Sequence, residues 1–302
     1  SWIFTRSSGV WTQQGPKLVG TGSIGPASQG VSVSLSADGN TAIVGGSSDN
    51  NNIGAAWIYT RTGGIWIQQG SKLIGTGATG TAFQGSSVSL SDEGNTAIIG
   101  GLGDNNLLGA AWVFTRSGGL WTQQGPKLVG TGALGAANQG SSVSLSADGN
   151  TALVGGNEDN NSIGASWVYV RSGGVWAQQG NKLVGTGVVG QSNQGVSVSL
   201  SADGNTAIIG GPGDNNLVGA AWVYKRTGAV WTQQGSKLLG SSAIGQTQQG
   251  ISVSISSDGN TAFVGGGGDN NFIGAAWVYS ESTTPVAPPV ITSFSPASGP
   301  IG

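Results

Sequence analysis

Apolar and polar residues alternate along the chain in short runs, and the same pattern returns every 55 residues. In one unit, residues 31–36 alternate apolar residues with serine, a period of two that predicts a half-buried strand. An Ala-Asp-Gly-Asn turn separates this run from an apolar run at 41–46, as expected for a β-hairpin. Two further strands are predicted at 54–61 and 65–73, and no segment shows the period of an amphipathic helix.

Two tryptophan series mark the repeat and together account for all 11 tryptophans. One series is Trp11, Trp66, Trp121, Trp176 and Trp231, and the other is Trp2, Trp57, Trp112, Trp167, Trp222 and Trp277. Residues 2–56 and 112–166 agree at about three quarters of their positions without a gap, which indicates a tandem repeat. Repeated units of four antiparallel strands favour a β-propeller over a β-helix or a sandwich.

We therefore predict an all-β fold, a five-bladed β-propeller of 55-residue four-stranded antiparallel blades over residues 1–280. The small, Ser-rich first strand suits the crowded centre of the ring. The fourth strand carries a lysine in every copy and a proline in two, which suits an outer edge. The third strand occurs six times and the others five. We expect the strand at 10–19 to close the ring with the strands at 251–279, so that residues 1–6 are either spare or displace the last copy of the third strand.

Composition narrows the range of functions. A net charge of −2 without a basic stripe disfavours a nucleic-acid partner, and no apolar run is long enough to span a membrane. The chain has no His and no Cys, and its carboxylates repeat from unit to unit instead of forming one asymmetric cluster, so we predict that it is not an enzyme. Because it has neither an initiating Met nor a signal peptide, we expect it to be part of a longer protein.

The loop between the second and third strands carries one aspartate per unit, followed by Asn-Asn. These aspartates are Asp49, Asp104, Asp159, Asp214 and Asp269. Carboxylate and amide oxygens suit calcium, so the five residues are candidate calcium ligands. The alternative is that they cap turns, as Asp and Asn commonly do. With one carboxylate per loop, we expect no cofactor to be required for folding, calcium being the only candidate.

Three other patterns have a structural and a functional interpretation. The connector at Gly20, Gly22 and Gly25 spells G-x-G-x-x-G, but a strand follows it instead of a helix, which favours turn chemistry over nucleotide binding. Acidic residues at the turn between the first two strands are also interpreted as turn formers. The tryptophans either pack between blades or form a sugar-binding platform.

The unit resembles the FG-GAP repeat in its bacterial extracellular form. The matching motifs are x-Gln-Gly before Ser-Val-Ser-Leu-Ser, Asp-Gly-Asn-Thr-Ala, Gly-Ala-Ala-Trp-Val-Tyr/Phe-Thr-Arg and Gly-x-Trp-Thr-Gln-Gln, across residues 1–280. A Pro-rich linker is predicted at 281–289, and residues 290–302 resemble the start of an IPT/TIG immunoglobulin-like domain. The resemblance implies a propeller, often of seven blades, in secreted or surface proteins. This chain has five units and lacks the Asp-x-Asp-x-Asp-Gly calcium loop of integrin-type repeats.

These observations predict a non-catalytic recognition or adhesion module, secreted or at the cell surface, which binds an extracellular protein, a glycan or matrix. The alternative is a structural repeat module or filament-forming subunit, because the spare third strand could complete a second copy of the chain.

Overall fold

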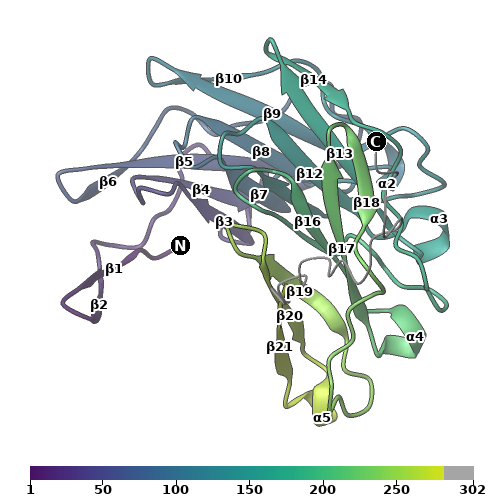
Figure 1. The fold of residues 1–302 in the computed structure, drawn as a ribbon. Coiled ribbons are helices and arrows are strands. Elements are labelled where there is room, and N and C mark those ends of the chain that lie inside the picture. The colour runs from purple at the N-terminus through teal and green to yellow at the C-terminus, as the bar shows by residue number, and fades with distance from the viewer. Residues whose placement is uncertain (282–302) are drawn as a thin grey trace, which may run out of the picture.

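The computed structural model describes residues 1–281, which form an arc of antiparallel sheets (Figure 1). The segment 282–302, which holds nearly all of the predicted linker and the predicted IPT/TIG start, lies outside the described residues. Four sheets have four strands each, and we call them the first to the fourth blade. A two-stranded sheet precedes them and a three-stranded sheet follows them; we call these the N-terminal hairpin and the C-terminal sheet.

The strands follow one another in chain order within each sheet. The N-terminal hairpin consists of β1 (Phe4–Ser7) and β2 (Val10–Gln13). The first blade consists of β3 (Ser32–Leu35), β4 (Thr41–Gly46), β5 (Ala55–Thr62) and β6 (Ile65–Gln68). The second blade consists of β7 (Ser87–Leu90), β8 (Thr96–Gly101), β9 (Ala110–Ser117) and β10 (Leu120–Gln123).

The remaining sheets repeat this plan. The third blade consists of β11 (Ser142–Leu145), β12 (Thr151–Gly156), β13 (Ala165–Ser172) and β14 (Val175–Gln178). The fourth blade consists of β15 (Ser197–Leu200), β16 (Thr206–Gly211), β17 (Ala220–Thr227) and β18 (Val230–Gln233). The C-terminal sheet consists of β19 (Gln249–Ile255), β20 (Thr261–Gly266) and β21 (Ala275–Ser280).

Between the second and third strands of each blade, and of the C-terminal sheet, lies a one-turn segment that the sequence predicts as a loop. These segments are α1 (Asp49–Asn52), α2 (Asp104–Leu107), α3 (Asp159–Ser162), α4 (Asp214–Leu217) and α5 (Asp269–Phe272). In each of them the two asparagines have positive φ and ψ, for example φ 49° at Asn105 and 57° at Asn106. The segments are therefore left-handed turns, a conformation that asparagine tolerates better than most residues. None of the described helices is long enough to cross a membrane.

The β-propeller architecture predicted from the sequence is confirmed, but the predicted closure of the ring is wrong. Strand β2 pairs with β1, and β21 pairs only with β20 among the described residues. The hairpin and the C-terminal sheet therefore stand apart at the two ends of the arc (Figure 1). The sixth copy of the third strand explains this result: as β1, it occupies the edge of β2 that β21 would need.

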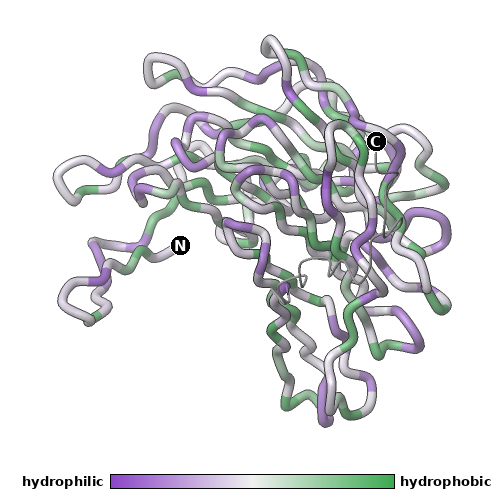
Figure 2. The backbone as a smooth tube through the Cα atoms, viewed as in Figure 1, coloured by the Kyte–Doolittle hydropathy of each residue, from purple (hydrophilic) through white to green (hydrophobic). Residues whose placement is uncertain are grey.

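The core lies between blades, not within them. One cluster joins Ile43 and Ile58 of the first blade to Val88, Leu90 and Trp112 of the second. Equivalent clusters join each following pair of sheets. Figure 2 shows stretches of apolar residues, in green, along the strands in the middle of the arc. A single blade is one sheet thick and has no second layer of its own, so its burial depends on its neighbours.

Two series of hydrogen bonds run around the centre of the arc. The backbone N–H of Ala37 donates to the carbonyl of Asp92, and Asp92 in turn donates to Ala147, each at 2.9 Å. The series continues through the fourth blade to the C-terminal sheet. Serines of the first strands form the other series, as where Ser34 accepts a bond from the Leu90 N–H at 3.1 Å. The period-two serines thus cross-link adjacent sheets at the centre, as their predicted position suggests.

Candidate functional site

The near-identical blades differ most at five positions. Across the five copies in residues 1–275, each of these positions holds four or five residue types, while every other position holds three or fewer. In the third blade and the connector that leads into it, they are Leu134, Ala136, Asn138, Asn157 and Ser162. We call these five positions, in all copies, the variable positions.

The variable positions meet on one face of the arc. They line two open pockets with volumes of about 510 and 300 Å³. The first is lined by Leu107, Leu134, Ala136, Asn138, Ser162 and Gln191 together with Gly135, Glu158 and Asn161. The second includes the next members of the series, Gln191, Asn193, Leu217 and Gln246. The fifth position adjoins the same surface, because Asn193 Nδ2 lies 3.4 Å from the carbonyl oxygen of Asn157.

A buried glutamine fixes the connector that carries three of the variable positions. Gln84 is fully buried, and its amide accepts a hydrogen bond from the Gly75 N–H at 2.5 Å and donates one to the Gly75 carbonyl at 3.0 Å. Gly75 must lack a side chain, because a Cβ there would lie 2.1 Å from Cδ1 of Trp112. Later glycines of the connector, such as Gly77 and Gly80, have positive φ. The G-x-G-x-x-G pattern therefore serves turn geometry and tryptophan packing.

The aspartates that are candidate calcium ligands bind the connector backbone that carries the variable positions. Asp104 is fully buried; its Oδ1 accepts a hydrogen bond from the Thr79 N–H at 2.7 Å, and its Oδ2 pairs with Lys127 Nζ at 2.5 Å. Asp49, Asp159 and Asp214 make the same contacts with Lys72, Lys182 and Lys237. Each carboxylate thereby ties its left-handed turn to a variable position of the connector.

The structure places the five aspartates in five separate loops. Asp269 accepts a bond from the Ile244 N–H at 2.8 Å and has no lysine partner among the described residues. Within residues 1–281, no three acidic side chains lie close enough together to hold a metal ion. The lysine already neutralises the carboxylate in four of the five loops. That calcium is not required for folding stays a prediction, and thermal melts in EDTA and in millimolar calcium would test it.

Two of the variable positions adopt a left-handed backbone whatever residue they carry. The position of Asn138 has φ between 53° and 55° in all copies, including that of Phe83. The position of Ser162 has φ between 66° and 69°, including those of Leu107 and Leu217. A bulky residue in this conformation costs about 1–2 kcal/mol relative to the right-handed one. The backbone at these two positions is therefore fixed by the framework and not by the side chain that it carries.

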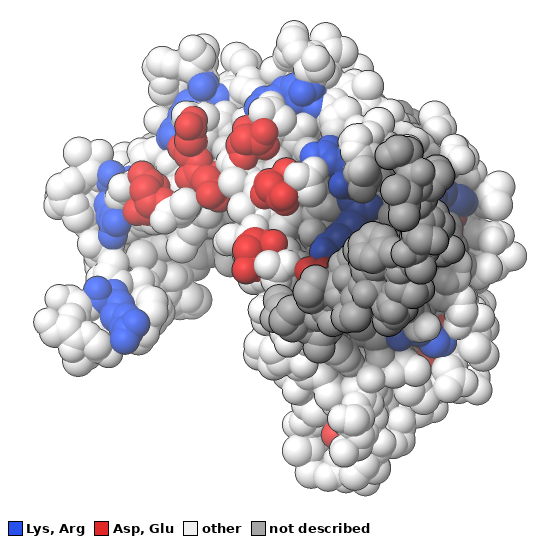
Figure 3. All heavy atoms as spheres, viewed as in Figure 1, with Lys and Arg blue, Asp and Glu red and all other residues white. Residues whose placement is uncertain are grey.

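The opposite end of the strands is nearly constant and acidic. Figure 3 shows acidic side chains gathered near the middle of one face, with basic side chains outside them. The turns between the first two strands carry acidic residues, as in Asp38, where hydrogen bonds from Ser36 and then Asn40 lower the pKa to about 2. Glu93 replaces this aspartate in the second blade. In the four copies that carry aspartate, the bonds from the neighbouring serine and asparagine confirm the role in the turn, and Glu93 accepts no such bond from the described residues.

Within the four blades, both tryptophan series pack at the junctions between sheets, whereas Trp2 and Trp11 of the N-terminal segment are 60% and 65% exposed. Trp57, Trp112, Trp167 and Trp222 are fully buried. In the other series, the Trp121 indole N–H donates to Gln69 Oε1 of the preceding blade at 2.9 Å, and the same oxygen lies 3.2 Å from Nη1 of Arg116. The Arg116 guanidinium carbon lies 5.4 Å from the centre of the Trp121 ring. This Gln–Arg–Trp clasp recurs at Trp66, Trp176 and Trp231.

Sequence analysis by motif missed the variable positions because none of them carries a motif. A position-by-position comparison of the five copies would have found them, because these five positions hold more residue types than any other position of the repeat. The sequence also repeats a Gln-Gln pair in every unit, which we interpret from the sequence as part of a solvated outer strand. In four of the five pairs, the second glutamine instead joins adjacent sheets through the clasp.

Comparisons with known proteins support the fold alone. No protein-family model matches the chain, and no curated protein matches it. Among solved structures, a protein from Lactobacillus plantarum is similar with a TM-score of 0.53 at 15% identity, over 91% of this chain and 72% of that one. TolB from Acinetobacter baumannii (TM-score 0.43, 11% identity, 83% and 54% covered) and a putative TolB from Agrobacterium tumefaciens (0.47, 14%, 78% and 69%) are also similar.

Proposed function

We propose that this chain is a non-catalytic recognition module that binds an extracellular protein or glycan through the variable positions. The observation that carries the proposal is that the five most variable positions of the repeat meet on one pocketed face. In repeat proteins, the differences between units commonly mark the binding face. The constant contacts beneath it supply a rigid support of the kind that binding loops require.

The chemistry of the pockets fits binding better than catalysis. Their polar groups are mainly amides, such as Asn138, Gln191 and Asn193. The one carboxylate in the first pocket, Glu158, accepts hydrogen bonds from the side chains of Asn157 and Ser162. Amides donate and accept hydrogen bonds without changing charge, which suits polar recognition and provides no general base near neutral pH.

The FG-GAP resemblance supports placing the module in a secreted or surface protein of the bacterial extracellular type. Its motif residues are the constant residues of the blades, including the buried tryptophans and the turn aspartates. In this proposal, the motif residues stabilise the propeller, and the residues at the variable positions determine which ligand binds.

A variant that takes residues from other blades tests the proposal. Leu107→Ser, Asn138→Ser and Gln191→Ala each introduce a residue that another blade carries at the same position, so we expect the fold to be retained. The triple variant should lose binding on arrays of glycans and of extracellular proteins to which the unaltered chain binds. The control is Thr115→Val with Thr122→Ala, two exchanges on the outer strands that other blades also carry.

Retained binding in the triple variant, or equal loss in the control, would reject the variable positions as the ligand surface. No ligand on either array would reject the recognition function in favour of the structural alternative. That alternative has its own support in the unpaired ends of the arc.

A further inference from the structure

The outer edge of β21 offers a strand-binding site. In the four blades, the third strand pairs with a fourth, as in the register Tyr224↔Gln233 and Arg226↔Trp231. The C-terminal sheet has three strands, and no described residue pairs with the outer edge of β21. Extended peptides commonly bind to such free sheet edges.

A pocket lies beside this edge, where the other blades carry the tryptophan of the clasp. It is lined by Leu238, Ala262 and Tyr279, with Gln234 and Glu281 at its polar side. Its volume is about 180 Å³. Gln234 is the counterpart of Gln179, whose Oε1 accepts the Trp231 indole N–H at 2.9 Å. The Gln234 Oε1 accepts no hydrogen bond from the described residues, so this oxygen can accept one from a tryptophan indole N–H.

Strand β2 and the segment that follows it carry the residues that this site lacks. Trp11 is 65% exposed, whereas its counterpart Trp121 is 9% exposed. Lys17 has no carboxylate partner among the described residues, and Asp269 has no lysine. These two occupy the positions that form the Lys127–Asp104 pair in the second blade.

The two ends of the arc also expose complementary apolar faces. Val33 and Leu35 of β3 are 61% and 53% exposed, although their counterparts are buried in the second and third blades. At the other end, Phe263 and Val278 are 51% and 58% exposed. In every inner junction these two kinds of face cover each other.

We propose that the free edge of β21 and the pocket beside it bind strand β2 of a second copy of this chain, joining copies head to tail. The register of the fourth blade places Gln13 opposite Tyr279, Thr12 opposite Ser280, and Trp11 opposite Glu281. Lys17 then reaches Asp269. Such a contact uses different surfaces on the two partners, so it can continue from copy to copy.

The strand comes from a second copy because the chain's own hairpin is held at the other end of the arc. Its Gln14 accepts hydrogen bonds from Arg61 at 3.2 Å and from Trp66 at 3.0 Å of the first blade. Strand β1 must leave β2 for β21 to pair there. That exchange replaces one short ladder by an equivalent one, and β1 has no buried residue.

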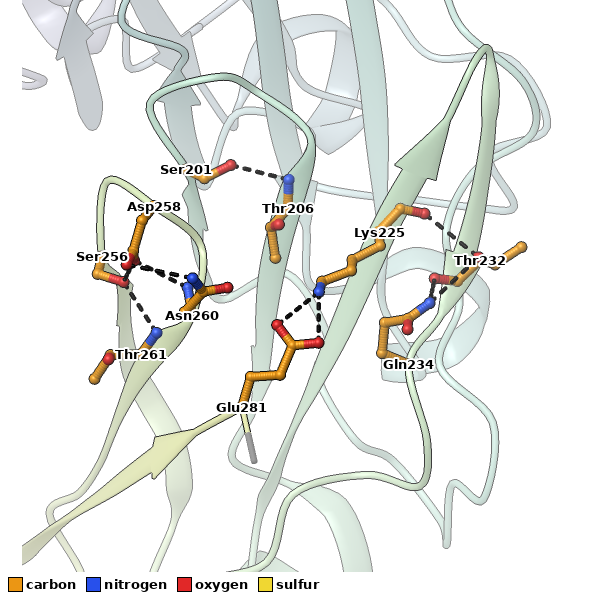
Figure 4. A network of polar contacts seen from close by, with 10 residues as sticks. All are labelled: Ser201, Thr206, Lys225, Thr232, Gln234, Ser256, Asp258, Asn260, Thr261 and Glu281. Atoms are coloured by element: carbon orange, nitrogen blue, oxygen red, sulfur yellow. Dashed lines mark hydrogen bonds and ion pairs between the residues drawn. The ribbon is translucent and has the colours of Figure 1, made fainter. Parts of the chain in front are cut away.

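One feature makes this junction weaker than the inner ones. Glu281 stands where the clasps carry arginine, so no guanidinium stacks on the incoming tryptophan. Glu281 instead pairs with Lys225 at 2.9 Å, beside the bonds that Lys225 and Gln234 make with Thr232 (Figure 4). The junction should therefore be reversible, and copies should exchange.

Paired single-cysteine variants test the proposal, because the chain has no cysteine of its own. A Thr12→Cys chain mixed with a Ser280→Cys chain should form a disulfide-linked heterodimer on mild oxidation. The matched control, Thr122→Cys with Ser280→Cys, should not, since Thr122 already pairs with Thr115 inside its blade. Adding Trp11→Ala should lower the heterodimer yield about tenfold, as for a central interface tryptophan.

A charge exchange provides a second readout. Lys17→Asp in one chain should lower the yield, and Asp269→Lys in its partner should restore it. Absence of the heterodimer, or a Trp11→Ala chain that cross-links as well as its parent, would overturn the proposal. So would a Thr12→Cys/Ser280→Cys chain that links only within itself, which would indicate ring closure. The variable positions take no part here, so either result leaves the recognition proposal standing.

Discussion

The second blade and the C-terminal sheet are built from almost the same residues but bury them differently. Ile98 of β8 is fully buried, while Phe263 at the same position of β20 is 51% exposed. Val113 of β9 is 1% exposed, and Val278 of β21 is 58% exposed. The difference lies in the next sheet along the arc: the third blade covers this face of the second blade, and no described blade follows the C-terminal sheet to cover the same face there. Equivalent residues therefore contribute to stability according to their junction.

Replacing the buried tryptophan by alanine should give the largest difference in stability between the second blade and the C-terminal sheet. Trp112→Ala removes a fully buried indole from a junction and should cost about 3–5 kcal/mol of unfolding free energy. Trp277→Ala, at the half-buried counterpart, should cost less than half as much. Urea unfolding followed by circular dichroism measures both. Equal losses would mean that the C-terminal sheet is covered in solution, as by the second copy proposed above.

Removing the lysine that pairs with a turn aspartate should have the next largest effect on stability. Lys127→Ala leaves the Asp104 carboxylate buried without its ammonium partner, and we expect about 3 kcal/mol of destabilisation. Lys17→Ala should change the unfolding free energy by less than about 0.5 kcal/mol, because Lys17 has no such partner among the described residues. Thermal melts of the two variants at dilute concentration compare them. A similar loss in both would contradict the pairing.

Two equivalent glycines near the centre of the arc allow a third comparison of the second blade with the C-terminal sheet. A Cβ at Gly100 would lie 2.2 Å from the Gly140 carbonyl oxygen of the next blade, which cannot move without disturbing the junction. At Gly265 the closest atom is the hydroxyl of Ser252 at 2.4 Å, which can rotate away. Gly100→Ala should therefore cost about 1–3 kcal/mol and Gly265→Ala under about 1 kcal/mol. Urea midpoints that fall equally would show that the clash is within the blade.

The smallest effect concerns the acidic turns. In the third blade, Asp148 accepts bonds from Ser146 and Asn150, which hold its pKa below the ordinary value even though burial acts to raise it. Glu93→Asp in the second blade should recreate these bonds and add about 0.5–1 kcal/mol at neutral pH. Because the folded-state pKa of Asp148 is lowered from 3.8, the gain should be present above pH 3.8 and decline as the pH falls below it. A gain that does not decline in acid would contradict this cause.

Most of the fold could be predicted from the repeat. The strand predicted at 41–46 is β4 to the residue, and the one at 54–61 is β5 shifted by one position. The strand predicted at 65–73 ends as a ladder at Gln68, and only Leu73 beyond it bridges back to Ala56. Local alternation specifies strands well because it records which face of each strand is covered.

Closure and the site could not be predicted in the same way. Counting strands says nothing about the angle between adjacent blades, which is set by packing at each junction. The turn aspartates have the oxygen donors that calcium prefers, but their lysine partners lie 23 residues further on, with a strand pair between. That spacing repeats in four loops and was visible in the sequence. The spacing alone does not show that the two residues pair, because the pair forms only when β9 and β10 fold back and bring Lys127 to Asp104.

The uniform junctions of an open arc have a consequence for how such a chain can evolve. In a closed ring, adding or losing a blade changes every angle, so the blade number is constrained. Here each clasp, serine cross-link and turn-to-turn bond involves only adjacent sheets. Duplication or deletion of one 55-residue unit would keep every remaining contact in register. The variable positions of a new copy could then diverge without altering the contacts that hold it in place.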